Sequence, residues 1–370
     1  MQKLFSFFKT SFCVLTILVI VVPRSVNAQA QQRQLPQEEV LETIVTDVQE
    51  EKEVEIGSSK QLYQKLEVFV TGEKRKGQKL IIESGTIPVA NVQKYKIGDK
   101  LLVTAIDSQG EEQLYISDYI RRTPLYWLFG LFVVLTVLIG RKRGIASLIG
   151  MGLSFWVIFQ FVLPQILAGK DPVTIAIIGS IFIIPITFYL SHGLNKKTTS
   201  AILGTIITLI ITGILANIFV DVSRLTGFAS EEAGFLQAAK PDLINIKGLL
   251  LAGIIIGVLG ILDDITISQS AIVYQLKKSS PTISFNNLFN QTMDVGRDHI
   301  ASVVNTLILV YTGAAMPLLL LFINSPHPYT EIINYEIVAE EIVRTLVASI
   351  GLILAVPITT LITSLLAKND

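Results

Sequence analysis

Charged residues are scarce in this 370-residue chain. They make up 16% of it against 51% hydrophobic residues, whereas a typical soluble domain is roughly 25% charged. The mean hydropathy of +0.58 agrees with that deficit. A chain of this composition lacks the polar surface that water demands, which excludes a soluble enzyme. The 30 basic and 30 acidic residues balance, so no excess of positive charge indicates nucleic acid as a partner.

Cysteine and histidine are also rare, and this limits the chemistry. The chain has one cysteine, Cys13, so neither an intrachain disulfide nor a cysteine-based zinc site can form. His192 and His327 have no ligand partner at metal-binding spacing, and the H-E-x-x-H pattern is absent. An aspartyl protease built from Asp263 and Asp298 would rest on residue types alone. We therefore expect no enzyme, no catalytic residue and no cofactor, and the sequence leaves any metal site undetermined.

The N-terminus has the pattern of a secretory signal. Lys3 and Lys9 give it a basic start, and an apolar run follows, which ends in small residues with cleavage expected after Ala28 or Ala30. The same run is long enough to be an uncleaved anchor helix instead. Residues 1–30 are therefore a signal peptide or a signal anchor, and both alternatives export the residues that follow.

Two polar segments come next. Residues 31–60 are rich in Gln and Glu and alternate only over 43–56, which predicts a tether. Residues 61–122 contain short runs of β-formers separated by turn residues. These predicted strands cover residues 66–70, 79–83, 100–104 and 113–117. We predict a small exported all-β domain, a barrel or a sandwich, which has no reactive cluster and suits a spacer or the docking of an envelope protein.

After residue 122 the chain becomes strongly apolar. Seven apolar stretches cover residues 123–140, 144–163, 172–190, 200–220, 248–262, 300–323 and 342–366. The first four lack charged residues, and each is near the ~20 residues that cross a ~30 Å hydrocarbon core. Only a lipid bilayer accounts for so many apolar helices. We predict a polytopic α-helical membrane bundle of about seven spans over residues 123–366.

Basic residues in the loops predict the orientation. With the β domain outside, nine basic residues fall in inside segments: Arg141, Lys142, Arg143, Lys196, Lys197, Lys277, Lys278, Arg297 and Lys368. Four fall in outside loops: Lys170, Arg224, Lys240 and Lys247. Because positive charge favours the inner side, the tail at residues 367–370 is expected in the cytoplasm.

Adjacent acids interrupt the fifth apolar stretch. If its helix continues to residue 276, Asp263 and Asp264 lie within the membrane, where a charge costs at least ~2.5 kcal/mol and marks function. Carboxylates beside hydroxyls suit a cation or a proton. The polar residues that complete this candidate site are Thr266, Ser268, Gln269 and Ser270. If the membrane span ends at Leu262 instead, the acids simply meet cytoplasmic water, and both alternatives stay open.

The sixth stretch carries a polar stripe, because Asp298, Ser302 and Asn305 share one helical face. We expect this face toward the bundle interior, since lipid would leave Asn305 without a hydrogen-bond partner. The stripe then serves either a bound ligand or interhelical hydrogen bonds. In the fifth stretch, close approach by another helix is predicted at three glycines: Gly253, Gly257 and Gly260.

Three segments carry a resemblance to a known family. They are GVLGILDDITISQ at residues 257–269, GRDHIASVVNTL at 296–307 and GAAMPLLLLF at 313–322. In this order they resemble the motifs of the YibE/F-like family of bacterial multipass membrane proteins, over about residues 40–366. The resemblance implies a permease-like protein of the bacterial inner or plasma membrane and names neither substrate nor site.

Two functions follow from these observations. The first is a carrier in which Asp263, Asp264 and Asp298 bind a coupling cation, a proton or a small solute. The second is a non-transporting scaffold or sensor whose exported β domain binds a partner. The lipid bilayer is the surrounding solvent in both.

Overall fold

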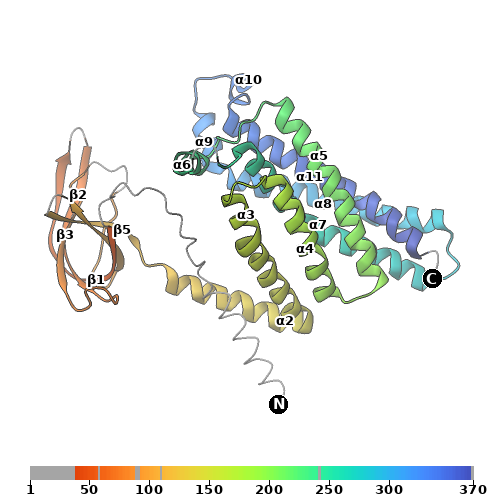
Figure 1. Ribbon diagram of the computed structural model, residues 1–370, viewed down its shortest axis with the longest axis horizontal. Coiled ribbons are helices and arrows are strands. Elements are labelled where there is room, and N and C mark those ends of the chain that lie inside the picture. Colours follow the sequence, from red (N-terminus) through yellow and green to blue (C-terminus); the bar gives the residue numbers. More distant parts are fainter. Residues whose placement is uncertain (1–37, 57–58, 88–91, 109–110, 241–242, 368–370) are drawn as a thin grey trace, which may run out of the picture. The chain divides into compact units, whose positions relative to one another are not determined.

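The computed structural model describes residues 38–56, 59–87, 92–108, 111–240 and 243–367. They belong to two compact units, one within Arg24–Leu135 and the other within Thr136–Asp370. The first contains a β-sheet and the second a bundle of helices (Figure 1). The predicted signal at residues 1–30 lies outside the described residues.

Five antiparallel strands form one sheet. They are β1 (Glu38–Ile56), β2 (Ser59–Val70), β3 (Lys79–Ser84), β4 (Lys100–Ser108) and β5 (Glu111–Tyr119). Their order is β3-β2-β1-β4-β5, and the long β1 pairs with both β2 and β4. The four predicted strands are confirmed as parts of β2 to β5. Residues of the edge strands β3 and β5 approach each other, so the single sheet curves around its core (Figure 1).

The prediction of a tether over residues 31–60 is wrong for β1. Leu41, Thr43 and Val45 alternate along β1 and are at most 1% exposed, and the Thr43 hydroxyl donates to the Leu101 carbonyl at 3.2 Å. Glutamates are frequent along the rest of β1, and they obscured the period of two that a half-buried strand shows. The β domain therefore includes the residues of β1 from Glu38 onward.

Side-chain hydrogen bonds join the sheet to two neighbouring segments of the chain. Gln64 is 1% exposed, and its amide pairs with the backbone of Tyr95, donating to the carbonyl at 3.0 Å and accepting from the N–H at 2.8 Å. Glu42 on β1 accepts two hydrogen bonds from Arg122, the first residue of the following helix. The Arg122 guanidinium holds the pKa of the Glu42 carboxyl below its ordinary value.

The rest of the described chain is helical. Its elements are α2 (Arg122–Val157), the π-helix η1 (Ile158–Val162), α3 (Leu163–Leu167), α4 (Pro172–His192), α5 (Lys196–Val222), α6 (Glu231–Ala239), α7 (Ile246–Ser279), α8 (Phe285–Ala314), α9 (Met316–Ile323), α10 (Tyr329–Ile332) and α11 (Glu336–Ala367). Among the described residues, five helical runs are long and apolar enough to cross a membrane, or six if α8 and α9, bent by 70°, form one broken span.

The difference from the predicted seven spans lies at the start of this region. The first two apolar stretches share one helical run, Arg122–Leu167, of 46 residues. A straight helix of that length would extend about 69 Å, more than twice a ~30 Å hydrocarbon core. Arg141 breaks it with φ 51° and ψ −130°. The break lies between the two predicted apolar stretches. A total of seven membrane spans requires each half of this run to cross the membrane separately.

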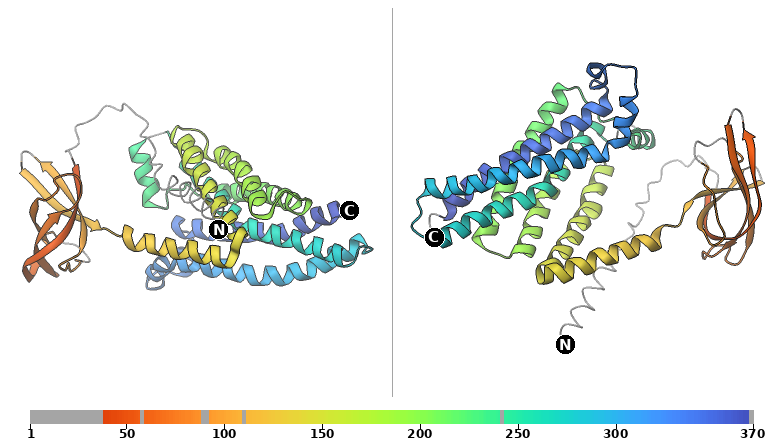
Figure 2. Two further views of the ribbon diagram at one scale, coloured as in Figure 1. Left: turned by 90° about the horizontal axis from the view of Figure 1, so that it is seen from below. Right: turned by 180° about the vertical axis from the view of Figure 1, so that it is seen from behind.

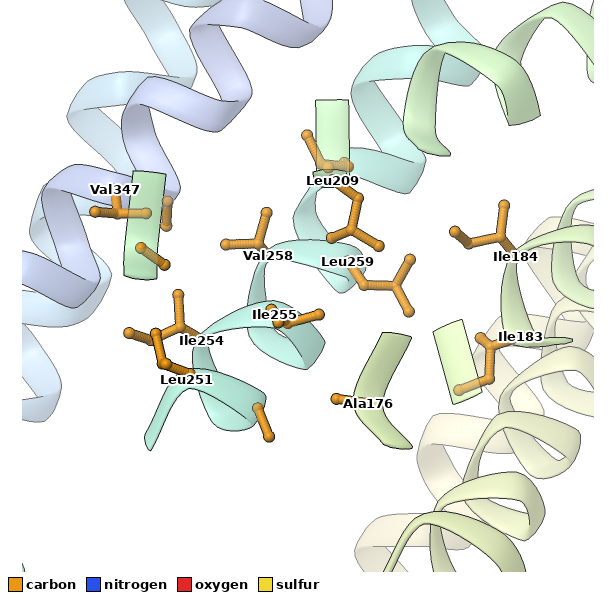
Figure 3. Packing of buried hydrophobic residues seen from close by; sticks show 14 of the residues in the cluster. Ala176, Ile183, Ile184, Leu209, Leu251, Ile254, Ile255, Val258, Leu259 and Val347 are labelled. Carbon is orange, nitrogen blue, oxygen red and sulfur yellow. The ribbon is translucent and has the colours of Figure 1, made fainter. Parts of the chain in front are cut away.

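The fifth apolar stretch is part of an unbroken helix. α7 runs from Ile246 to Ser279, so the helix continues past Asp263 without a break, and whether the membrane span also extends past Leu262 stays a prediction. α7 packs against α4, α5, α8 and α11. In Figure 3, Ile254, Ile255 and Leu259 of α7 lie among side chains of α4, α5 and α11. α7 is therefore the central helix of the bundle.

α5 and α11 form the closest helix pair. They run antiparallel, and Gly204 of α5 lies against Thr359 of α11 while Gly351 of α11 lies against Thr212 of α5. Small, buried residues continue at every fourth position: Ser200, Thr208 and Ala216 on α5, and Ala355, Thr363 and Ala367 on α11. Without bulky side chains the two backbones approach each other, and van der Waals contact holds them. Figure 2 shows both helices from two further sides.

The prediction that Gly253, Gly257 and Gly260 admit a neighbouring helix is wrong within the described chain. A Cβ atom added at any of the three would meet nothing within 4 Å. The interior face of α7 is occupied by branched apolar residues, which leaves this glycine stripe on the exposed face. Close helix contact occurs instead at Gly204, Gly351 and a third glycine, Gly296 on α8.

This difference is testable with one substitution at each kind of glycine. Gly204→Ala places a methyl group against Thr359 and is expected to destabilise the protein by about 1–3 kcal/mol through overpacking. Gly253→Ala meets open space and is expected to stabilise the helix by about 0.5–1 kcal/mol. Chemical unfolding of the purified protein in detergent measures both, and equal effects of the two variants would contradict the packing described here.

Candidate functional site

Asp263 lies near the middle of α7. The helix has 34 residues, which extend about 51 Å, and Asp263 is about 26 Å from its first residue. Asn245 caps the N-terminus by accepting from the Gly248 N–H, and two lysines, Lys277 and Lys278, occupy the last turn. Between Gly248 and Leu276 the helix has only two charged side chains, Asp263 and its neighbour Asp264.

A cavity of about 310 Å³ opens beside Asp263. α2, α4 and α7 enclose it, and its size falls within the range of small-molecule sites. Its polar side chains are Ser147 and Ser154 from α2, Thr187 and Ser191 from α4, and Asp263 from α7. The apolar wall comprises Met151, Phe155, Ile158, Ile183, Phe188, Ile256 and Leu259. We refer to it as the Asp263 pocket.

Helix spacing brings these hydroxyls to one place. Ser147 and Ser154 are seven residues apart on one face of α2, and Thr187 and Ser191 are one turn apart on α4. Gly150 lies between the helices, where an added Cβ would be 3.7 Å from Thr187. A methyl group added there would meet Thr187 in ordinary van der Waals contact, and the hydroxyls of α2 and α4 line the pocket.

Two of these hydroxyls, Ser154 and Thr187, present acceptors rather than donors to the pocket. Ser154 donates its hydroxyl hydrogen to the Gly150 carbonyl at 3.0 Å, and Thr187 donates to the Ile183 carbonyl at 3.0 Å. Once the hydrogen is used within the helix, the oxygen lone pairs remain free to accept. Together with the Asp263 carboxylate they form a set of oxygen ligands suited to a cation or to a group that donates hydrogen bonds.

Asp263 itself is half-buried. Within the described parts of the chain its carboxylate takes part in no ion pair and no side-chain hydrogen bond. Asp264 is exposed on the adjoining face of α7 and does not line the pocket. The described residues contain no group of three or more His, Cys, Asp or Glu side chains arranged for a metal ion, so the pocket relies on a single carboxylate.

Three other predicted site residues of α7 hold the helices together instead. Thr266, Gln269 and Ser270 are at most 1% exposed. The Thr266 hydroxyl is 2.7 Å from that of Thr205, and the Ser270 hydroxyl is 2.8 Å from that of Ser200. Gln269 donates to the Thr360 hydroxyl at 2.8 Å and to the Thr292 carbonyl at 3.1 Å. These contacts join α7 to α5, α8 and α11, away from the Asp263 pocket. Ser268 is half-buried and does not line the pocket either.

The polar stripe of α8 also lies apart from Asp263. Asp298, Ser302 and Asn305 are exposed, so the expectation that they face the bundle interior is wrong. α8 packs on α11 and α7 through a different stripe, in which Thr292 and Gly296 are buried. Residue 298 is displaced by about 200° around the helix from residue 296, which turns the predicted stripe outward.

Sequence reasoning missed the hydroxyls of α2 and α4. Ser147, Ser154, Thr187 and Ser191 lie in or beside stretches interpreted only as apolar spans. Their signal was a pair of small polar residues at helical spacing in each of two uncharged stretches. That signal is weak, because Ser and Thr are common in membrane helices for packing reasons.

Water access to the pocket is testable by cysteine labelling. Replacing Cys13 by serine removes the only cysteine, and single cysteines are then placed at Ser154, Thr187 and Ser180. We expect a water-soluble methanethiosulfonate reagent to modify the first two positions. Ser180 is 0% exposed on the same helix as Thr187, so its cysteine is expected to stay unmodified. Mass spectrometry of the intact protein measures the modification, and equal labelling at all three positions would exclude a defined pocket.

Comparison with known proteins gives a family match for the helical part of the chain. The model of the family described as YibE/F-like protein matches residues 128–369, which contain every residue of the Asp263 pocket. The match begins beyond the β-sheet and confirms the resemblance that the three motifs indicated in the apolar region. Searches of curated proteins and of solved structures find no match. With well over half of its length matched and its long apolar helices, the chain is a multipass membrane protein that belongs to the YibE/F-like family.

Proposed function

We propose that this protein is a carrier of the bacterial inner or plasma membrane that binds a proton, a small cation or a cationic solute at Asp263. The observation that carries the proposal is a carboxylate midway along a central apolar helix that has no partner among the described residues. It lies in a pocket where the Ser154 and Thr187 hydroxyls offer acceptor oxygens. A charge at that depth is costly, so it is retained where it serves a ligand. Asp264 and Asp298, which do not line the pocket, are not part of this proposed site.

Irregular helices next to the pocket support a carrier. The π-helix η1 begins at Ile158, which lines the pocket, and such segments often occur at functional sites. Pro185 lies inside α4 between the pocket residues Ile183 and Thr187, where it removes one backbone hydrogen bond. Carriers use such interruptions to bind ions and to bend around the binding site.

The loop charges complete the proposal. Basic residues in the loops assigned to the inside support a cytoplasmic C-terminus and an exported β domain. In this arrangement α2 and α4 cover the side of α7 on which a ligand would bind Asp263. Protonation of the Asp263 carboxylate lowers the free-energy cost of burying it. Binding of a cation lowers the same free-energy cost, so a proton and a cation compete for the Asp263 carboxylate.

Neutralising the two neighbouring aspartates separates this proposal from a nonspecific effect of charge. Asp263→Asn is expected to lower cation-coupled flux at least about tenfold, equivalent to 1.4 kcal/mol. Asp264→Asn, its matched control on the exposed face, is expected to leave flux within about twofold of the unsubstituted protein. Flux is measured in proteoliposomes with a lumenal pH indicator and a Na⁺ indicator under imposed ion gradients. Undiminished flux in the Asp263→Asn variant would rule out the proposed site.

A scaffold or sensor role is the second candidate. The β domain has a core of its own, built from Leu41, Leu66, Val103 and their neighbours, and it lies outside the range matched by the family model. A separately folded unit of this kind suits the binding of an envelope protein. If deletion of residues 38–120 abolishes function in cells while Asp263→Asn has no effect, this second role is favoured over the carrier.

A further inference from the structure

Close contacts fix the directions of the helices around the Asp263 pocket. A Cβ added at Gly150 of α2 would be 3.7 Å from Thr187 of α4. One added at Gly179 of α4 would be 2.6 Å from Val162 of η1, the segment that continues α2. Later residues of α2 and η1 therefore lie beside earlier residues of α4, and the two run antiparallel.

The pocket is polar at one end and apolar at the other. α7 runs parallel to α4, because Gly248 in its first turn lies against Pro172, the first residue of α4. Positions on all three helices can therefore be compared along one axis. Polar lining residues gather toward the end of α4: Ser147, Thr187, Ser191 and Asp263. Apolar lining residues occupy the opposite end: Phe155, Ile158, Ile183 and Ile256. Ser154 lies between the two ends.

The two ends are far enough apart to hold different parts of one ligand. Asp263 follows Ile256 on α7 by seven residues, which extend about 10 Å. Ser191 follows Ile183 on α4 by eight residues, which extend about 12 Å. The volume of about 310 Å³ falls within the range of sites for small organic molecules. A bare ion held at Asp263 would leave the apolar end without contacts.

The carboxylate at the polar end is open to a ligand. Asp263 is half-buried and lines the cavity, and no lysine, arginine or histidine among the described residues lines it. An ammonium group supplies the missing positive charge and donates up to three hydrogen bonds. The Thr187 oxygen can accept from the same group, because its own hydrogen is donated to the Ile183 carbonyl.

The apolar end disfavours a second charge. Three branched aliphatic side chains and the ring of Phe155 form it, and none of these side chains accepts a hydrogen bond. A charged group placed there would lose its hydration without gaining a partner. A hydrocarbon group is favoured there, because its apolar surface is removed from water. The two ends together match a ligand with one ammonium group and an apolar body.

We propose that the Asp263 pocket binds an amphipathic organic monoamine, with its ammonium group at Asp263 and its apolar body against Phe155, Ile183 and Ile256. This inference rests on the proposed function, because it names the class of solute that the ligand site at Asp263 takes. The polar and apolar ends of one cavity, about 10 Å apart along α7, set this class.

Three probes test the ligand class on the full-length protein purified in detergent, with binding measured by isothermal titration calorimetry. 2-Phenylethylamine has both parts, methylamine has the ammonium group alone, and 1,4-diaminobutane carries a second charge. 2-Phenylethylamine is expected to bind at least about tenfold more tightly than either of the others. Equal affinity for all three amines, or absence of 2-phenylethylamine binding, would overturn the proposal.

Two exposed phenylalanines give a matched pair of variants that test the apolar end. Phe155 is 49% exposed and lines the pocket, whereas Phe182 of α4 is 55% exposed and does not line it. Phe155→Ala is expected to weaken 2-phenylethylamine binding at least about fivefold, and Phe182→Ala is expected to change it less than about twofold. Equal effects of the two substitutions would contradict the proposed position of the apolar body.

Asp263→Asn tests the polar end and separates this inference from the carrier function. It is expected to weaken 2-phenylethylamine binding at least about tenfold. If it lowers proton or Na⁺ flux in proteoliposomes while 2-phenylethylamine does not bind the unsubstituted protein, the carrier function stands and the ligand class is wrong. If 2-phenylethylamine binding depends on Asp263 and Phe155 but no flux occurs, the ligand class stands and the carrier function is wrong.

Discussion

The bundle depends on the close antiparallel contact between α5 and α11. Gly204 accommodates Thr359, and Gly351 accommodates Thr212, so each helix supplies one glycine and one threonine at matching positions. In lipid no hydrophobic force drives helices together, and close van der Waals packing of small residues takes its place. This contact sets the distance between the two helices, and α7 packs against both of them.

The position of α7 decides the role of its polar residues. Hydroxyl and amide contacts with α5, α8 and α11 occupy Thr266, Gln269 and Ser270. Asp263 is turned toward α2 and α4, where it meets only hydroxyls and apolar side chains. The same helix therefore carries a structural polar face and a chemically available carboxylate.

The sequence predicted the positions of helices and strands better than it predicted which of their faces are buried. Hydrophobic run lengths located the apolar helices because lipid tolerates few charges within a span, and turn residues separated four of the five strands. β1 was not predicted as a strand because its outward-facing glutamates outnumber its inward-facing apolar residues. Asp263 was identified because an acid in a long apolar helix is expensive. The stripe of Asp298, Ser302 and Asn305 was assigned to the wrong side, because periodicity shows which residues share a face and not where that face points.

The sequence by itself determined that this is a membrane protein with a polar β domain and an acid within a long apolar stretch, because those properties follow from composition and run length. It also carried the motifs of the family. Only the tertiary structure decided which acid lies in a pocket and that Ser147, Ser154, Thr187 and Ser191 join it. These depend on how helices far apart in the chain rotate and pack against each other, and small residues permit many such arrangements until the contacts are formed.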